Sequence, residues 1–270
     1  YWNKMFDLIK YKLNAGLISD IGRKRFENQD NFSFGRLINA DKKEQVEQEL
    51  KGQRLPQAYA VMDGMGGEKL GAQASLEAAR FFSDIKEKIL MILPKLDGKE
   101  RERVFNSLVH SLNEKVCRMA SENNIKQSGT TFVAAFFVKD RVYLLSVGDS
   151  RIFLIRNRYA VCQNKLDIIN FTIMEGGKEK YLKGGISQFL GMNTREYKLI
   201  PHITVLKFKE GDKFLLCSDG LTDYVSSEEM GKIVYENPIE DSIDLLLKLG
   251  LDRGGRDNIT ILLVQPSKQT

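Results

Sequence analysis

Apolar residues along the chain recur with two different periods, which predict helices and strands in separate regions. From Gly67 to Met119 they return every three or four residues, the spacing of an amphipathic helix. Pro and Gly interrupt this pattern between Pro94 and Gly98, so it predicts two long helices. Their apolar positions are Ala72, Leu76, Ala79, Phe82, Ile85 and Ile89 in the first helix, and Val104, Leu108, Leu112, Val116 and Met119 in the second.

Runs rich in β-branched and aromatic residues follow the second helix and predict strands. Turn residues separate three of these runs, which we expect to form one antiparallel meander: Thr131 to Val138, Arg141 to Val147 and Arg151 to Ile155. Similar runs predict strands at Ala15 to Ser19, Tyr59 to Met62, Ile203 to Phe208, Lys213 to Cys217 and Ile259 to Val264.

Three segments have weaker patterns. Residues 2–13 carry apolar side chains at helical spacing and predict a short amphipathic extension that packs on the body, or alternatively contacts a membrane surface or a partner. Residues 41–54 are highly charged and predict a solvated hairpin loop or a short helix. Residues 163–186, in which glycine pairs flank the basic string KEKYLK, predict an irregular, mobile flap.

The C-terminal part begins its helices with recognisable signals. Ser226 and Glu229 form a capping box that opens a short helix, and Pro238 begins another. Strands occur on both sides of the long helical pair, and no Pro- or Ser-rich linker divides the chain. We therefore expect residues 1–270 to form a single α/β domain.

Composition indicates a soluble globular protein. The chain has 270 residues, of which 42% are hydrophobic and 29% charged. The net charge of +5 comes from lysines and arginines scattered among acidic residues, which suits an anionic substrate but gives no basic stripe for nucleic acid. No apolar stretch approaches the roughly 18 to 20 residues that span a bilayer. Because the chain begins at Tyr1, we expect a fragment, a processed product or a trimmed chain.

Cysteine and histidine usage argues against several kinds of site. The three cysteines, Cys117, Cys162 and Cys217, show no CxxC spacing, which indicates free thiols in a reducing, cytoplasmic compartment. With only His110 and His202 present, a histidine-rich zinc site or a Ser-His-Asp relay would rest on isolated residues. We expect both histidines to be structural.

Carboxylates recur where apolar runs meet turns. In AYAVMDGMGG, Asp63 ends a strand-like run and is followed by glycine, which exposes a carboxylate and a backbone carbonyl together. One such junction is usually an ordinary turn, but Asp149, Asp219 and Asp257 occupy similar junctions, and Asp30 in ENQD is a fifth candidate. Oxygen ligands without Cys or His select hard cations such as Mg²⁺ or Mn²⁺.

Convergence of these carboxylates predicts hydrolytic chemistry. If Asp63, Asp219 and Asp257 meet, bound cations must relieve their mutual repulsion. Two such cations could share a water, lower its pKa and direct it at a phosphorus atom. Arg25 would complete the site, since its planar guanidinium suits two phosphate oxygens, although by itself it predicts only a surface salt bridge.

The ordered set of motifs resembles the PPM family of metal-dependent protein Ser/Thr phosphatases, the type 2C phosphatases. The likeness runs from Ser19 to Val264 and rests on the strings SDIGRKRFENQD, VMDGMGG, SGTT, VGDSRIF, GDKFLLCSDGLTD and GGRDNIT. The resemblance implies a four-layer α-β-β-α sandwich with two central antiparallel sheets flanked by helices. It also implies direct attack on phosphorus by metal-bound water, without a phosphoenzyme.

The resemblance assigns a role to each candidate residue. Asp63 would bridge two Mn²⁺ or Mg²⁺ ions, with the Gly64 carbonyl on one and Asp219 and Asp257 on the other. Asp30 would act in the outer shell through water. Arg25 would be the phosphate clamp. Asp149 would join Asp219 in binding a third, weaker metal ion.

Three departures from the family pattern bear on the expected function. Met65 stands where eukaryotic members usually carry a histidine, which indicates a bacterial-type enzyme. Gln29 replaces a frequent Glu, and the Thr-x-Asp-His-Ser string expected after the meander is absent. We expect a monomeric phosphoprotein phosphatase that opposes a Ser/Thr kinase. The alternatives are a phosphatase for a small phosphoester and an inactive regulatory binding module of the same fold.

Overall fold

Two antiparallel sheets lie face to face in the computed structural model, which describes residues 11–41, 43–66, 70–123, 128–175 and 178–268. Within these residues, one sheet has six strands in the order β10-β9-β14-β15-β1-β3. Its strands are β1 (Tyr11–Asp20), β3 (Gln45–Arg54), β9 (Arg151–Arg156), β10 (Tyr159–Cys162), β14 (Lys213–Cys217) and β15 (Ile259–Lys268). The other has five strands in the order β13-β8-β7-β4-β2, with bounds β2 (Asn31–Ser33), β4 (Gln57–Met62), β7 (Phe132–Val138), β8 (Arg141–Val147) and β13 (His202–Lys207).

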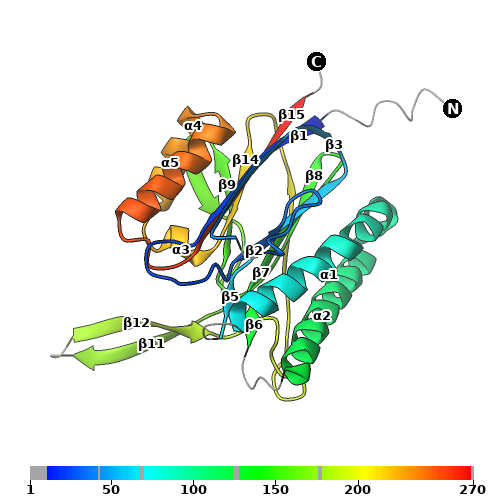
Figure 1. Cartoon of the computed structure of the whole chain (residues 1–270). Helices are drawn as coiled ribbons and strands as arrows, with labels where there is room; N and C mark the ends of the chain where they lie inside the picture. The colour runs from blue at the N-terminus through cyan, green and yellow to red at the C-terminus, as the bar shows by residue number, and fades with distance from the viewer. Residues whose placement is uncertain (1–10, 42, 67–69, 124–127, 176–177, 269–270) are drawn as a thin grey trace.

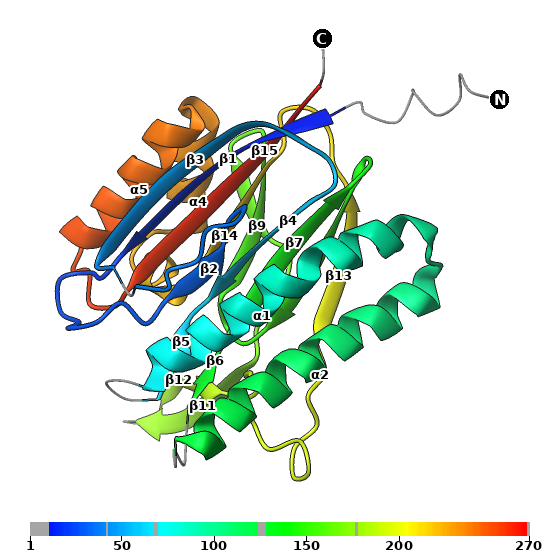
Figure 2. The same ribbon diagram turned by 45° about the vertical axis from the view of Figure 1, so that its right-hand side comes forward.

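Helices cover the outer faces of both sheets, which gives the α-β-β-α sandwich (Figure 1). The long helices α1 (Leu70–Ile92) and α2 (Gly98–Glu122) run side by side over the five-stranded sheet, as Figure 2 shows. The six-stranded sheet is covered by α3 (Asp219–Thr222), α4 (Ser227–Glu236) and α5 (Ile239–Asp252). In the described residues, no helix is long and apolar enough to cross a membrane.

Apolar side chains fill the spaces between these layers. Between the sheets, Phe137 lies at the centre, with its ring centroid 5.4 Å from that of Phe214 and 5.9 Å from that of Phe208. Under the long helices, Phe82 is fully buried and packs edge-on against Phe132 and Phe136. Such aromatic contacts add to the free energy of burial and hold the strands in one register.

The predictions of the two long helices and of the C-terminal helices are confirmed. The three- and four-residue spacing corresponds to α1 and α2, and a 3₁₀ turn at Leu93–Lys95 lies between them. At the start of α4, Ser226 accepts a hydrogen bond from the Glu229 amide and the Glu229 carboxylate accepts one from the Ser226 amide, as the capping box predicts. These features are local, so neighbouring residues determine them.

The charged segment 41–54 was predicted wrongly. Residues Gln45–Arg54 form β3, an edge strand paired with β1 except at a register shift around Lys51 and Gly52, and not a loop or short helix. The charges suit an edge strand because one side of it faces water and charged side chains discourage further pairing. Residues 11–13 are likewise in β1 and not in a helix, with Tyr11 opposite Lys268. The rest of the predicted N-terminal helix lies outside the described residues.

Two further predictions are corrected by the sheet pairing. The third run of the predicted meander, β9, pairs with β10 and β14 in the other sheet, so the Gly148-Asp149-Ser150 turn crosses between sheets. The segment 163–186 is also not irregular. It contains the antiparallel hairpin of β11 (Ile168–Glu175) and β12 (Lys178–Ile186), which projects from the body in Figure 1. The turn between these strands lies outside the described residues.

Candidate metal and phosphate site

The candidate carboxylates lie where strands of both sheets end or begin. Asp63 follows β4, Asp219 opens α3 directly after β14, and Asp257 precedes β15. Asp30 precedes β2, and Asp149 lies between β8 and β9. The strand pairing brings these points to one end of the sandwich, because Met62 is opposite Asn31, and Cys217 is opposite both Ile261 and Arg151.

The backbone of Asp63 is fixed by two threonines from the neighbouring strand segment. Its amide donates to the Thr131 hydroxyl at 3.0 Å, and its carbonyl accepts from the Thr131 amide at 2.9 Å. The Thr130 hydroxyl donates to the same carbonyl at 2.8 Å. The SGTT string is therefore the support of Asp63, a role that the sequence did not assign to these threonines.

The next residue, Gly64, occupies a position without room for a side chain. A Cβ atom there would lie 2.3 Å from the Gly71 carbonyl oxygen and 2.5 Å from that of Gln29. Gly64 therefore permits the turn after Asp63, the short strand β5 (Gly64–Met65) and the first turn of α1 to pack closely. This contact keeps the polar segment around Gln29 beside Asp63.

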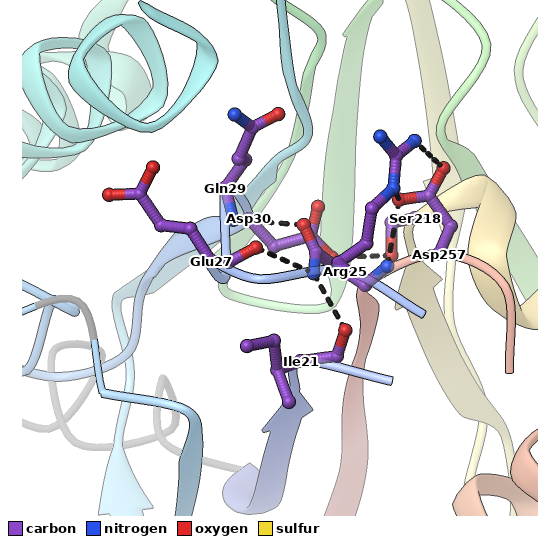
Figure 3. Close-up of polar contacts among 8 residues, drawn as sticks. Ile21, Arg25, Glu27, Gln29, Asp30, Ser218 and Asp257 are labelled. Atoms are coloured by element: carbon purple, nitrogen blue, oxygen red, sulfur yellow. Dashed lines mark hydrogen bonds and ion pairs between the residues drawn. The ribbon is translucent and has the colours of Figure 1, made fainter. Parts of the chain in front are cut away.

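Asp30 is buried next to the base of the site. Its carboxylate accepts a 2.7 Å hydrogen bond from the Ser218 hydroxyl, which Figure 3 shows. Burial raises the pKa of Asp30 to about 7, because removal from water disfavours the charged form. Hydrogen bonds from Ser218 and Thr260 oppose this rise, while the charges of Asp257 and Asp219 add to it.

Asp63 is the residue on which all the other candidate carboxylates act. Burial raises its pKa well above the ordinary value, and the negative charges of Asp30, Asp219, Asp257 and Asp149 raise it further. All five predicted carboxylates therefore contribute to one region of negative potential. Such a cluster is stable in the ionised form only when positive charge compensates it.

Arg25 supplies part of that positive charge. Its Nε donates to Asp257 Oδ1 at 2.8 Å and its Nη2 to Asp257 Oδ2 at 2.5 Å, a bidentate pair visible in Figure 3. The hydrogen bond to Asp257 raises the pKa of Arg25, and the charges of Asp63 and Asp219 contribute to this rise. The predicted phosphate clamp thus lies beside the carboxylates, with its guanidinium engaged by one of them.

This pairing leaves the carboxylates apart. In the part of the chain that the structure describes, no three His, Cys, Asp or Glu side chains are placed closely enough together to hold a metal ion. Asp257 faces the Arg25 guanidinium, and Asp30 faces Ser218. The donor set nevertheless fits hard divalent cations, since every candidate ligand is an oxygen. Burial, and after it the charges of neighbouring carboxylates, raises the pKa of both Asp30 and Asp63, so a bound cation would stabilise their ionised forms.

Asn258 is a structural residue that the sequence prediction missed. Its Nδ2 donates to the Ile21 carbonyl at 2.9 Å and the Glu27 carbonyl at 3.1 Å, while its Oδ1 accepts from the Gln29 amide. The side chain therefore secures both ends of the loop that carries Arg25. Its position directly after Asp257 was the signal that could have identified it.

Comparison with known proteins identifies the family. The sequence model described as protein phosphatase 2C matches residues 28–253. The chain belongs to the protein phosphatase 2C family. The resemblance inferred from the motifs is thereby confirmed, and the protein phosphatase 2C fold accounts for the two sheets and their outer helices. The alternative of an inactive regulatory binding module therefore means a member of this family that has lost its catalytic activity.

Relatives in bacteria agree with this assignment. The serine/threonine phosphatase Stp of Listeria innocua is 31% identical over 262 residues, which cover 94% of this chain and 96% of that protein. The serine/threonine protein phosphatase PstP of Mycobacterium tuberculosis is 30% identical over 232 residues, covering 84% of this chain and 42% of that protein. This protein phosphatase 2C chain is therefore of the bacterial type that Met65 indicated.

Solved structures share the fold. The catalytic domain of PstP in complex with two manganese ions superposes with a TM-score of 0.70 at 24% identity, covering 95% of this chain and 99% of that one. PppA, a regulatory component of T6SS in Pseudomonas aeruginosa, gives a TM-score of 0.71 at 21% identity, covering 96% and 99% of the two chains. At these identities the likeness establishes the α-β-β-α sandwich.

Proposed function

We propose that this chain removes phosphate from phosphoserine and phosphothreonine in proteins, using two Mn²⁺ or Mg²⁺ ions held by Asp63, Asp219 and Asp257. One observation carries the proposal. The charges of Asp30, Asp219, Asp257 and Asp149 all raise the pKa of Asp63, so the five carboxylates share one electrostatic site in a protein phosphatase 2C chain.

The metal ions would supply the positive charge that lowers the pKa of a bridging water and polarises the phosphoryl group. The chain itself supplies the ligands and their placement. Asp63, fixed by Thr130 and Thr131, would bridge the two ions, with the Gly64 carbonyl beside it. Asp30 would act through water, held in place by Ser218.

Arg25 would orient the phosphate group. Its guanidinium already presents two parallel N–H groups to the two oxygens of Asp257, and phosphate offers oxygens of similar spacing. With Asp257 engaged as a cation ligand, the Arg25 guanidinium would be free to bind two phosphate oxygens. Arg25 would then stabilise negative charge on the phosphoryl group as it transfers to water.

The residue after Gly64 cannot donate a proton to the leaving group. Met65 has a thioether, which neither donates nor accepts a proton at ordinary pH. We propose that solvent delivers that proton. We further propose that the chain acts as a monomer within a single phosphatase domain and opposes a Ser/Thr kinase, whose phosphorylated products would be its substrates.

The test measures hydrolysis of an aryl phosphate and of a phosphothreonine peptide in Mn²⁺, Mg²⁺ or EDTA. We expect metal-dependent turnover that EDTA abolishes and that Asp219→Ala lowers by at least about a thousandfold, since a metal ligand is lost. Asp244→Ala is the matched control, because Asp244 is an exposed carboxylate on α5.

The outcomes separate the alternatives. Turnover of the aryl phosphate with no turnover of the peptide would indicate an enzyme for a small phosphoester. No turnover of either substrate, in a protein that calorimetry shows to bind Mn²⁺, would contradict the proposal and indicate the regulatory binding module.

A further inference from the structure

A continuous series of hydrogen bonds leads from Asp63 to the turn that carries Asp149. The Thr131 hydroxyl accepts from the Asp63 amide at 3.0 Å and lies 2.7 Å from the Ser150 hydroxyl. Thr131 and Ser150 are both fully buried. The two carboxylates that the proposed function places in the metal site therefore share a rigid polar support between the sheets.

The same turn is held from its other side by Asp167. The Gly148 amide donates to Asp167 Oδ2 at 2.9 Å, and the Asp167 amide donates to the Gly148 carbonyl at 3.0 Å. Gly148 has φ +100°, and a Cβ atom there would lie 2.8 Å from Thr131 Cγ2. The turn thus needs both a glycine and an external acceptor to keep its conformation.

Asp167 is itself fixed by residues from the far side of the hairpin. Its Oδ1 accepts from Gln188 Nε2 at 2.8 Å and lies 2.8 Å from His202 Nε2. The Asp167 carbonyl accepts from the Ser187 amide at 2.8 Å. Asp167 directly precedes β11, Ser187 and Gln188 directly follow β12, and His202 begins β13, so one buried carboxylate joins the base of the hairpin to the Asp149 turn.

Attachment of the hairpin alone does not explain this arrangement. Leu190 and Thr130 already exchange a pair of backbone hydrogen bonds of 2.9 Å each, which anchors the chain after β12 to the strand segment beside Asp63. The Asp167 carboxylate is an additional link, and it is made to the residue before Asp149. Outer hydrogen-bond partners of this kind orient metal-binding carboxylates and adjust the affinity of a site.

We propose that Asp167, held by Gln188 and His202, is a positioning residue that fixes the Gly148–Ser150 turn and so keeps Asp149 in place for the more weakly bound divalent cation. This inference rests on the proposed function and extends it by taking Asp149 as the ligand of a further cation, the role that the family resemblance implies. It also links the seating of the β11–β12 hairpin to the metal site, because both depend on the same carboxylate.

The principal test is calorimetric titration of Mn²⁺ into the whole chain, which reads metal binding without catalysis. Asp167→Asn offers only one oxygen to donors on both sides, so the Gly148 turn or the Gln188 contact is lost. We expect Asp167→Asn to weaken the weakest class of Mn²⁺ sites about tenfold, with the tight class unchanged. Asp149→Asn should remove that weak class altogether.

Two controls distinguish positioning from general stability. Asp212→Asn alters another buried carboxylate, which is bonded to Arg156, and should leave both classes of Mn²⁺ site unchanged. His202 lies at the far end of the hydrogen-bond series from Asp63. His202→Gln keeps an N–H donor for Asp167 and should retain the wild-type Mn²⁺ affinity of the weak class of sites. His202→Leu removes the donor and should weaken that site.

A second measurement does not require metal. Hydrogen exchange in EDTA should show faster exchange of the segment 147–152 in Asp167→Asn and His202→Leu, and no change in His202→Gln. If Asp167→Asn does not fold, the two His202 variants give the same comparison by calorimetry and by exchange.

The inference is overturned if Asp167→Asn and His202→Leu lower the melting temperature but leave the weak Mn²⁺ class and the exchange of 147–152 unchanged. Asp167 would then only anchor the hairpin. The proposed function fails separately, if the wild type binds Mn²⁺ but hydrolyses neither substrate. Absence of Mn²⁺ binding in the wild type would overturn both proposals at once.

Discussion

The buried carboxylate of Asp30 should make the metal-free protein less stable as the pH rises. Burial raises its pKa from the ordinary value of 3.8 to about 7, so the folded state retains the proton over a range in which the unfolded chain has lost it. The free energy of unfolding therefore falls between about pH 4 and pH 7 and stays low above that range. The charged form is the one that the fold disfavours.

The magnitude follows from the pKa change. One pKa unit corresponds to about 1.4 kcal/mol, so the whole change lowers stability by about 4 kcal/mol, an upper value for one buried carboxyl. Between pH 5.5 and pH 8 the unfolded chain is already ionised, and the folded state loses its proton only near pH 7. This window accounts for about 2 kcal/mol of the total.

Asp30→Asn removes the ionisation while keeping an oxygen that accepts from Ser218. We expect the variant in EDTA to lack this fall, so that the stability difference between variant and wild type shifts by about 2 kcal/mol in favour of the variant from pH 5.5 to pH 8. Urea unfolding followed by circular dichroism measures it. Asp244→Asn, an exposed carboxylate on α5, is the matched control.

Equal pH dependence of wild type and Asp30→Asn in EDTA would refute this reasoning, because Asp30 would then ionise alike in the folded and unfolded states. Addition of Mn²⁺ gives an independent check. Bound cations compensate the negative charge of the cluster, so the wild type should regain stability at pH 8 more than at pH 5.5.

Three further variants test other parts of the structure. Arg25→Ala should lower kcat/KM for a phosphothreonine peptide at least about tenfold without weakening Mn²⁺ binding in calorimetry, since the guanidinium competes with cations for Asp257. Asp212→Asn breaks the bidentate pair with the partly exposed Arg156 and should cost about 2 kcal/mol in urea unfolding, with activity retained. Phe82→Ala empties a buried aromatic site and should cost about 3 to 5 kcal/mol by the same assay; a loss below 1 kcal/mol would show that the helices repack.

Several wrong predictions share one physical cause, which is that pairing partners distant in sequence decide them. Residues 45–54 carry enough charge to suggest a solvated loop, yet β1 provides backbone partners along most of the segment. The run after Gly148-Asp149-Ser150 continues the strand pattern of β8 but joins the other sheet. No local period distinguishes a strand that pairs with its predecessor from one that crosses to another layer.

The site shows the same division. The apolar-to-turn junctions singled out Asp63, Asp149, Asp219 and Asp257, because a turn beside a strand exposes a carboxylate wherever the strand lies in the fold. Asp30 was found only from the polar string ENQD. Their convergence depends on strand register, and so does the engagement of Arg25 by Asp257. Asp167 and His202, separated by 35 positions, gave no joint signal, and their contact emerges only when the hairpin folds back.

The sequence by itself determined the long helices, the capping box of α4, the strands with apolar β-branched runs and the family, since each depends on residues close together in the chain or on ordered motifs. The tertiary structure alone decided which sheet each strand joins, how the carboxylates share one electrostatic site, and which side chains support them. Those properties arise from long-range hydrogen bonds and from burial, which raises the pKa of Asp30 and Asp63 only when distant segments exclude water together.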